Sequence, residues 1–354
     1  MAKLILDEED LKDEYVPPVE INKAVVETIK EELNIPSNYI TVNLISNGKL
    51  EKMGVPKTLH FRNYTGHEAL QINSSDEYDR MKNICNVLTQ MNYEHYNCLN
   101  LTVEDITYIL MRIHGAFIGR TIEQQCYIDE TIEDDRKLNN KANITTVDVN
   151  IGTIPIQILG KDINDIDLPV QVKAPFTLTD KITGDKFTFK IATIADTIIA
   201  NKYCKQLNAE NAIKYAKIKM TLQKLENDPS DKLFNFMCEH EDECKEYYQY
   251  MQNYVTQVAE ITQALQITSI NGEDISQDIE KQWDAYQNKV SASMWLAYSK
   301  VMKQFQYGLQ NRVKVFSEVL GGAPVERTFQ FQPFDFLLHI NNKQADDTIE
   351  CTFD

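Results

Sequence analysis

The sequence lacks every short motif at which enzymes commonly do chemistry. Its 354 residues contain no phosphate-binding G-x-x-x-x-G-K-[ST], no dinucleotide-binding G-x-G-x-x-G, no zinc-binding H-E-x-x-H, no nucleophile elbow G-x-S-x-G and no EF-hand loop. Active sites are also assembled from residues far apart in the sequence, so these absences lower the expectation of an enzyme without excluding one. We expect a non-enzymatic protein and predict no catalytic residue.

Long apolar runs, a secretion signal and a cysteine framework are also missing. No run of about 18 apolar residues occurs, so no membrane-spanning helix is expected. The N-terminus begins Met-Ala-Lys-Leu-Ile-Leu and then turns acidic, which does not fit a signal peptide. The seven cysteines are odd in number and irregularly spaced, as is typical of a chain kept reduced. These features predict a protein made in the cytoplasm.

Positive charge is scarce as well. The chain has 36 basic against 53 acidic residues and a formal net charge of -17. This charge repels a phosphate backbone, so direct binding to nucleic acid is not expected. The excess of carboxylates fits a basic protein partner, and it equally fits a chain whose acidity serves solubility alone.

The elements that are present predict a mixed α+β fold. Residues 1–18 combine six acidic residues with two prolines and predict a flexible acidic arm that orders against a partner. Residues 19–193 are expected to form an N-terminal α+β domain, which opens with an amphipathic helix over 19–33. Short strands with turns follow between Tyr39 and Phe61, where glycine and proline interrupt β-branched and aromatic residues.

Two amphipathic helices are expected next. Apolar residues recur at three- and four-residue steps over 78–91 and again over 103–117. Thr102 stands just before the second stripe with Asp105 three residues later, a spacing that predicts the capped start of a helix. Both stripes are interpreted as core rather than as ligand sites.

Between 121 and 191 the pattern changes to short alternating runs, which predict an antiparallel β insert. The runs cover 147–151, 154–158 and 170–173. The clearest hairpin joins 176–179 to 187–191 through a turn at Thr183-Gly184-Asp185.

The second half, 194–320, is expected to be a helical domain. It begins at a capping-box pattern formed by Thr193 and Asp196. Turn residues divide it into three segments, at Asp228-Pro229 and at Asn271-Gly272. The last segment is predicted to be helical from about 274 to 320, because apolar residues recur at helical steps until two glycines stop them. The pattern leaves open whether these long helices form one bundle or extend as separate arms.

The C-terminal segment, 321–354, is expected to contribute an aromatic strand. Aromatic and polar residues alternate between Thr328 and Ile340, and Pro333 places this strand at a sheet edge or a bulge. The candidate interface consists of its phenylalanines, Phe329, Phe331, Phe334 and Phe336. They either complete an internal sheet or form an edge that pairs with a neighbouring subunit.

One local cluster offers metal-ligand chemistry, at Cys238-Glu-His240-Glu-Asp-Glu-Cys244. Zinc sites usually combine a closely spaced cysteine pair with a second pair of ligands, and this spacing fits no such site. The alternative is a solvated acidic helix face, which we favour. No metal and no cofactor are predicted.

The order of elements over residues 57–128 points to a known family. The strand Thr58-Leu-His-Phe61 leads to Tyr64-Thr-Gly-x-Glu68, then to a helix around 83–88, to the segment 101–114 and to a strand entering the β insert at Cys126-Tyr-Ile. This order resembles the baseplate hub and hub-assembly proteins of contractile-tailed bacteriophages of the T-even type. The long helices after Thr193 lie outside the resemblance.

The resemblance implies a non-enzymatic phage tail protein, either a baseplate hub component or a factor that assembles the hub. It also implies other tail and baseplate proteins as partners, oligomerisation within the virion, and a location in the host cytoplasm during assembly or in the virion tail. Relatives carry paired cysteines in the β insert, as if for zinc, whereas this sequence has only Cys126 there, so no metal is carried over.

Two other functions stay open from the composition. The surplus of carboxylates also suits a metal-dependent hydrolase or nuclease that holds Mg²⁺. The acidic arm also suits a host-directed adaptor protein that mimics nucleic acid. Phosphoester cleavage assays discriminate the first function, and binding to a basic host factor discriminates the second.

Overall fold

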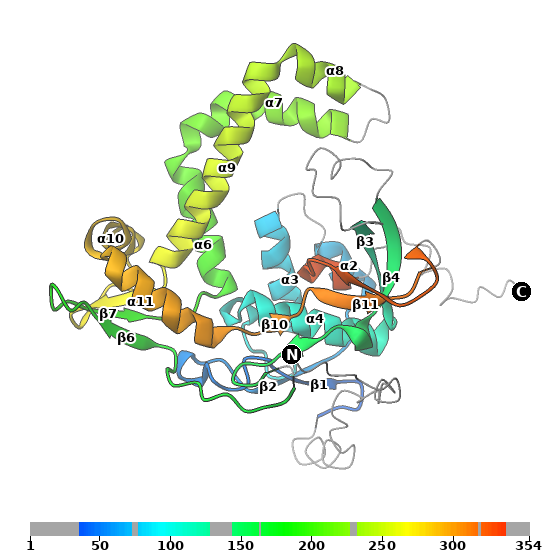
Figure 1. Ribbon diagram of the computed structural model, residues 1–354, viewed down its shortest axis with the longest axis horizontal. Helices are drawn as coiled ribbons and strands as arrows, with labels where there is room; N and C mark the ends of the chain where they lie inside the picture. The colour runs from blue at the N-terminus through cyan, green and yellow to red at the C-terminus, as the bar shows by residue number, and fades with distance from the viewer. Residues whose placement is uncertain are drawn as a thin grey trace, which may run out of the picture.

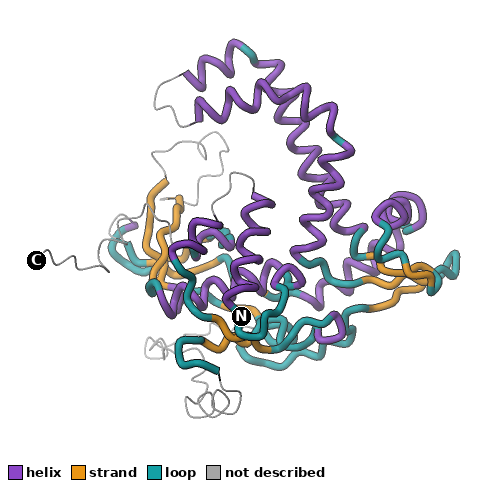
Figure 2. Tube along the Cα trace, turned by 180° about the vertical axis from the view of Figure 1, so that it is seen from behind, coloured by secondary structure: helices purple, strands orange, loops and turns teal. Residues whose placement is uncertain are grey.

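Helices and small antiparallel sheets together give a mixed α+β fold, which confirms the predicted fold class. The computed structural model describes residues 35–72, 77–127, 144–162, 164–226, 232–317 and 320–337. A body of strands and shorter helices carries one long helical arm (Figure 1, Figure 2). The predicted acidic arm, 1–18, and the predicted helix over 19–33 lie outside the described residues.

The first part of the body forms the predicted strands and helices. It contains β1 Ile40–Asn43, β2 Thr58–Phe61, α2 Gly66–Ile72, α3 Glu77–Met91 and α4 Val103–Phe117. The two strands are antiparallel, with Ile40 opposite Phe61. The hydroxyl of Thr102 accepts the backbone N–H of Asp105 and caps α4, as the sequence predicts. The apolar stripe of α4 is buried, which confirms its interpretation as core.

The β insert is a two-stranded ribbon followed by loops. β3 Thr121–Tyr127 pairs antiparallel with β4 Ile144–Asn150, and the short β5 Ile156–Gln157 pairs with β10 Gly308–Leu309. The strand predicted at 170–173 is wrong. Val170 and Val172 pack on the core from an extended loop, and among the described residues no strand runs beside them. Val170 and Val172 alternate with polar residues because one side of this loop faces the core and the other side faces solvent.

A four-stranded antiparallel sheet, ordered β6–β7–β8–β9, lies where the arm leaves and re-enters the body. Its strands are β6 Phe176–Thr179, β7 Lys186–Phe189, β8 Ile267–Ile270 and β9 Glu273–Asp274. The β6–β7 hairpin confirms the predicted one, with Gly184 at a φ of 80° in its turn. The β8–β9 hairpin turns at Asn271 and Gly272, which both have positive φ as a type I′ turn requires. From the sequence pattern, only a break between helical segments is predicted at these two residues.

The arm consists of four helices inserted between β7 and β8. They are α6 Ile194–Leu207, α7 Ala209–Glu226, α8 Lys232–Glu239 and α9 Glu241–Ala264. α6 begins at the predicted capping box, in which the side chains of Thr193 and Asp196 each accept the other residue's backbone N–H. Figure 1 shows these helices rising away from the body as an arm. The predicted break at Asp228-Pro229 lies outside the described residues.

The helical segment predicted from about 274 to 320 is wrong as one element. Its pieces are α10 Ile279–Asp284, a π-helical turn at Ala285–Lys289, α11 Ala292–Met302, a 3₁₀ turn at Lys303–Phe305, β10, and β11 Arg312–Val315. Val290 is extended, and the hydroxyl of Ser291 caps α11 by accepting the N–H of Met294 at 3.2 Å. The helical period continues across this break because side chains on both sides, such as Ala285 before it and Met294 after it, pack on the core.

One principal hydrophobic core runs through the body. Its buried side chains extend along the chain from Val42 to Leu337 and include Phe187 and Phe189 of the sheet. Segments that follow the arm, among them Tyr298 of α11, return to pack with residues that precede it. The core therefore crosses the predicted domain boundary between 193 and 194. Two smaller clusters lie in the arm.

Candidate interaction surface

The aromatic strand predicted between Thr328 and Ile340 is wrong in its described part. β12 Val325–Thr328 pairs with β11 and then ends. Pro333–Phe336 form a short 3₁₀ helix instead of continuing the ladder. A proline fits the first position of a helical turn because it has no N–H to donate there. The alternating pattern thus belongs to a loop and a helical turn packed on the body.

The four phenylalanines of the predicted interface lie against the principal core. Phe329 and Phe336 are 2% and 0% exposed, whereas Phe331 and Phe334 are partly buried. The backbone is held in place too, because Nδ1 of His114 on α4 lies 3.1 Å from the carbonyl oxygen of Phe336. At least Phe329 and Phe336 are therefore inaccessible to a partner in this fold.

The Cys238–Cys244 cluster is divided between two helices. α8 ends at Glu239 and α9 begins at Glu241, with the ring of His240 between them 4.6 Å from the ring of Phe236. Cys238 is exposed, whereas Cys244 is buried inside the arm. Across the described ranges, no three histidine, cysteine or carboxylate side chains are grouped so that they could hold a metal ion. None of the helices in the described part of the chain is long and apolar enough to cross a membrane.

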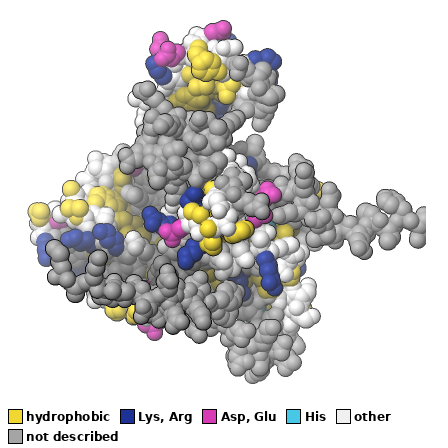
Figure 3. All heavy atoms as spheres, turned by 45° about the vertical axis from the view of Figure 1, so that its right-hand side comes forward, with side chains coloured by type: hydrophobic (Ala, Val, Ile, Leu, Met, Phe, Trp, Pro, Cys, Tyr) yellow, Lys and Arg dark blue, Asp and Glu magenta, His cyan; other side chains and the backbone are white. Residues whose placement is uncertain are grey.

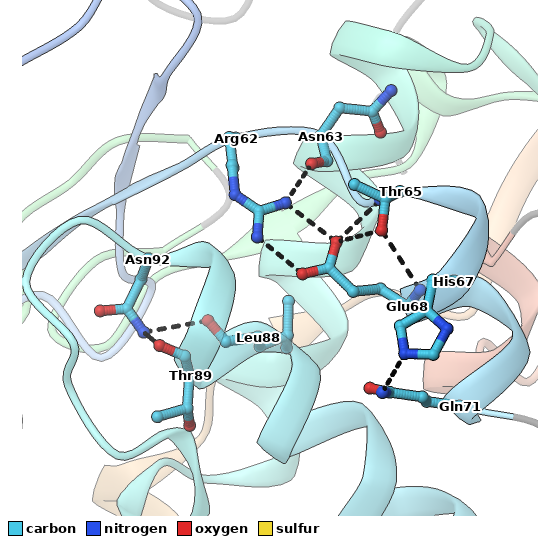
Figure 4. A network of polar contacts seen from close by, with 9 residues as sticks. All are labelled: Arg62, Asn63, Thr65, His67, Glu68, Gln71, Leu88, Thr89 and Asn92. Carbon is cyan, nitrogen blue, oxygen red and sulfur yellow. Dashed lines mark hydrogen bonds and ion pairs between the residues drawn. The ribbon is translucent and has the colours of Figure 1, made fainter.

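A polar network joins β2 to α2 (Figure 4). The guanidinium nitrogens of Arg62 lie 2.6 and 2.9 Å from the two carboxylate oxygens of Glu68. The same carboxylate accepts the N–H of Thr65 at 2.8 Å, and Thr65 Oγ1 accepts the N–H of Glu68 at 3.3 Å, which makes a capping box. These donors, Arg62 above all, lower the pKa of Glu68 to about 2. The contacts of this carboxylate therefore serve to cap α2.

A buried carboxylate lies at the start of α4. Asp105 is 0% exposed and accepts the N–H of Ser46 at 3.1 Å and the hydroxyl of Thr102 at 3.3 Å. The hydroxyl of Tyr307, from the segment before β10, donates to Thr102 at 3.0 Å. Burial raises the pKa of Asp105 to about 6, because the charged form is poorly solvated there. Three distant segments of the body meet at this group.

A third polar contact pairs His60 with Glu94. Nδ1 of His60 lies 2.5 Å from one carboxylate oxygen of Glu94, and the other oxygen accepts the backbone N–H of His60 at 3.1 Å. A contact of this kind occurs between the histidine and the carboxylate of catalytic triads. The residue opposite His60 on β1 is Thr41, and the Thr41 hydroxyl and Nε2 of His60 are both buried without a partner among the described residues. Because the Thr41 hydroxyl is buried, it cannot reach a substrate from solvent as a nucleophile would. We therefore assign the His60–Glu94 pair a structural role.

The arm has two small cores of its own. The base core joins α6 to the second half of α9 and consists of Ala200, Cys204, Val258, Ile261 and Leu265. The tip core joins α7 to the first half of α9 and consists of Ile218, Leu222, Cys244 and Tyr247. Between the two cores the amide of Asn208 donates to the side chain of Gln257 at 2.6 Å. The tip therefore begins where α6 ends.

Exposed apolar side chains gather on the arm. In the described part of the chain, seven of the fifteen exposed large hydrophobic residues belong to it, namely Ile199, Leu207, Ile213, Met220, Phe234, Tyr248 and Val255. At the tip, Ile213, Met220 and Phe234 are 79%, 62% and 68% exposed. Figure 3 shows hydrophobic side chains together at the top of the molecule with charged side chains around them. Such apolar patches with a polar rim mark contact sites on soluble proteins.

One face of α7 combines apolar and basic side chains. Ile213, Lys217, Met220 and Lys224 follow one another at steps of four, three and four residues, so they form one row, and all four are exposed. Within the described ranges neither lysine has an ion-pair partner. The other side of the helix carries the buried tip core. We call these four residues the lysine row.

The junction of α8 and α9 carries the opposite charge. Phe234 of α8, Glu239 and Asp242 are exposed. Within the described ranges Glu239 has no ion-pair partner, whereas Asp242 attracts the ammonium group of Lys245, which itself pairs with Glu241. The first turn of α9 holds two more acidic residues, Glu241 and Glu243, which favour the positive end of the helix dipole. We call Phe234, Glu239 and Asp242 the acid corner.

The alternating sequence pattern indicates an interface at the C-terminal phenylalanines and does not indicate one at the arm tip. A signal for the tip exists in the sequence of α7. Ile218 and Leu222 lie on one side of this helix, while Ile213 and Met220, seven residues apart, lie on another. A helix with apolar residues on two faces leaves one face uncovered when its neighbours, here α8 and α9, pack on the other face.

Comparisons of the chain with family models, with curated proteins and with solved structures find no match.

Proposed function

We propose that this chain is a non-enzymatic component or assembly factor of the tail baseplate of a contractile-tailed phage, and that its arm binds neighbouring tail proteins. The observation that carries the proposal is the arm tip, where Ile213, Met220 and Phe234 are exposed on helices held away from the body. Apolar side chains in a helical row gain free energy when they enter a groove of another protein.

The body supports the proposal in two ways. Its polar groups are used to join segments, as Arg62 and Glu68 join β2 to α2 and as Asp105 joins α4 to Ser46. Its order of elements over residues 57–128 resembles baseplate hub and hub-assembly proteins. Within that stretch, the Thr65–Glu68 pattern acts as a helix cap, which gives these residues a structural role.

The test uses a phage whose own copy of the chain is deleted and is supplied in trans. One variant lacks the arm tip, residues 209–253, with Asn208 joined to Tyr254 by a short glycine-serine linker. The gap is easily closed, because Asn208 already contacts Gln257 through its side chain. A control variant, Leu296→Ser, removes an exposed apolar side chain of α11 outside the arm.

We expect particles made with the full chain and with the Leu296→Ser control to be infectious, and the tip-deleted variant to yield defective tails. Mass spectrometry of purified particles then separates the two versions of the proposal. A tail component is present in mature particles, whereas an assembly factor is absent from them but still required. Infectious particles formed without the chain, or with the tip deleted, contradict the proposal.

A further inference from the structure

The arm tip carries two patches of opposite charge, and we propose that they bind a second copy of this chain. The lysine row of one copy docks on the acid corner of the other, and the acid corner of the first docks on the lysine row of the second. The inference rests on the proposed function, because it names the partner of the same arm surface.

The lysine row has the form of a helix-docking surface. Ile213 and Met220 are exposed and one heptad apart, which is the spacing at which side chains enter successive holes of a facing helix. Lys217 and Lys224 alternate with them in the same row. Lysine covers apolar surface with its stem while its ammonium group stays at the rim. A partner for this row needs an apolar side chain flanked by carboxylates.

The acid corner supplies an apolar side chain and carboxylates, at separations similar to those within the lysine row. Phe234 is exposed and apolar, and Glu239 and Asp242 follow it along the chain. Phe234 and Glu239 are separated by about 7.5 Å of helix axis, and Ile213 and Lys217 by about 6 Å. The separations along the helix axes are therefore of similar size in the two patches, although Glu239 lies on another side of α8 than Phe234 and Asp242 belongs to α9.

The presence of both patches on one tip favours a second copy over an unrelated partner. Within one chain the two patches do not cover each other, because Ile213 and Phe234 both remain exposed in the folded arm. A two-fold axis lets each copy cover both patches of the other in one closed contact. The net charge of -17 opposes self-association in general, and the exposed lysines of α7 offset this repulsion locally.

Two charge-reversal variants test the pairing. One is Lys217→Glu with Lys224→Glu, and the other is Glu239→Lys with Asp242→Lys. All four side chains are exposed, so both variants are expected to fold, which circular dichroism checks. In sedimentation equilibrium the wild-type full chain is expected to dimerise. Each variant alone should dimerise with a dissociation constant at least about tenfold higher, because like charges then face each other.

The equimolar mixture of the two variants gives the decisive result. In a mixed pair every reversed patch faces a reversed partner, so the heterodimer is expected to regain the wild-type affinity. A charge-matched control, Lys202→Glu with Lys219→Glu, changes exposed lysines outside the row and should dimerise like the wild type.

A wild-type chain that stays monomeric up to about 100 μM, far above micromolar affinity, contradicts the inference. A mixture that stays monomeric while the wild type dimerises contradicts the pairing of the two patches. The proposed function is tested separately. If the chain dimerises but phage tails form without it, only the proposed function is contradicted. If the chain stays monomeric but phage tails need it, only the dimer inference is contradicted.

Discussion

Glu68 and Asp105 show how opposite environments act on the same carboxyl group in one body. Glu68 accepts four donors, two from Arg62 and two from Thr65, which favour its charged form. Asp105 accepts two donors but is fully buried at the start of α4, and burial favours its neutral form. The two groups therefore make the stability of the body depend on pH in opposite directions.

Replacing Glu68 by Gln is expected to lower the free energy of unfolding at pH 7 by about 2 kcal/mol, because the partly buried Arg62 loses its counter-charge. The folded pKa lies below the ordinary value of 4.5, at about 2. The contribution of the carboxylate is thus present above that ordinary value and is lost as the pH falls toward the folded pKa.

Urea unfolding of wild type and variant at pH 7 and at about pH 3 measures this effect, and the difference should shrink at the lower pH. Glu51→Gln, at an exposed carboxylate, serves as the control and should leave stability unchanged within about 0.5 kcal/mol. A difference that stays the same at both pH values speaks against the charge pair.

Replacing Asp105 by Asn should have the opposite dependence on pH. The folded pKa is about 6, above the ordinary 3.8, so the ionised carboxylate costs stability as the pH rises through this window. The stability of the Asn variant relative to wild type should therefore rise between pH 4 and pH 8, by at most about 3 kcal/mol. Thermal unfolding across that range measures it, and parallel curves for the two proteins would count against this assignment.

Only local contacts at the residue scale could be predicted from the sequence. The caps at Thr102 and Thr193 follow from spacing alone, because donor and acceptor lie three residues apart. The contacts of Glu94 with His60 and of Asp105 with Ser46 join segments that meet only in the fold. No spacing in the sequence specifies such contacts.

At the scale of elements, periodicity predicts burial better than it predicts where an element ends. The stripes over 78–91 and 103–117 are single helices, as expected. The stripe from 274 to 320 crosses an extended residue, Val290, without losing its period. The sequence carries a signal for that break, since Ser291 is a good N-cap, and Asn271-Gly272 likewise carries a signal for the β8–β9 hairpin.

The tip core gives the arm a local stability that can be measured apart from the body. Leu222→Ala removes a buried side chain of α7 and is expected to lower the opening free energy of the tip helices by about 2 to 4 kcal/mol. Amide hydrogen exchange should quicken in α7 and in the first half of α9, while α4 stays protected.

Gln223→Ala is the matched control for this prediction, because Gln223 is exposed on the same helix and lies outside the lysine row. Its effect on exchange should stay within about 0.5 kcal/mol. If Leu222→Ala quickens exchange in α4 as strongly as in α7, the tip and the body form one cooperative unit and the prediction is wrong.

At the scale of the whole molecule, the class of fold could be predicted and the arrangement could not. The balance of helical and alternating patterns indicates α+β correctly. The choice between bundle and arm, and the return of the chain into the first core after the arm, depend on pairings such as β5 with β10. The residues near a short strand do not indicate which distant strand it will pair with.

The tip deletion of residues 209–253 also tests how the molecule is divided. The principal core contains no residue from this range. In differential scanning calorimetry the main transition of the tip-deleted chain should therefore stay within about 2 °C of that of the full chain, a shift worth about 1 kcal/mol at this size. The unfolding enthalpy should fall, because the tip core is gone. Loss of the main transition would mean that the tip supports the body.

The position of the arm within the sheet also sets an order of folding. β7 and β8 are neighbours, with Phe189 opposite Ile267, although all four arm helices lie between them in the chain. During synthesis the sheet cannot be completed until α9 has been made, because β8 follows it. The packing of α6 against α9 brings the two strand ends together and shortens the loop that their pairing has to close. The base of the arm thus serves the folding of the sheet below it before the tip meets any partner.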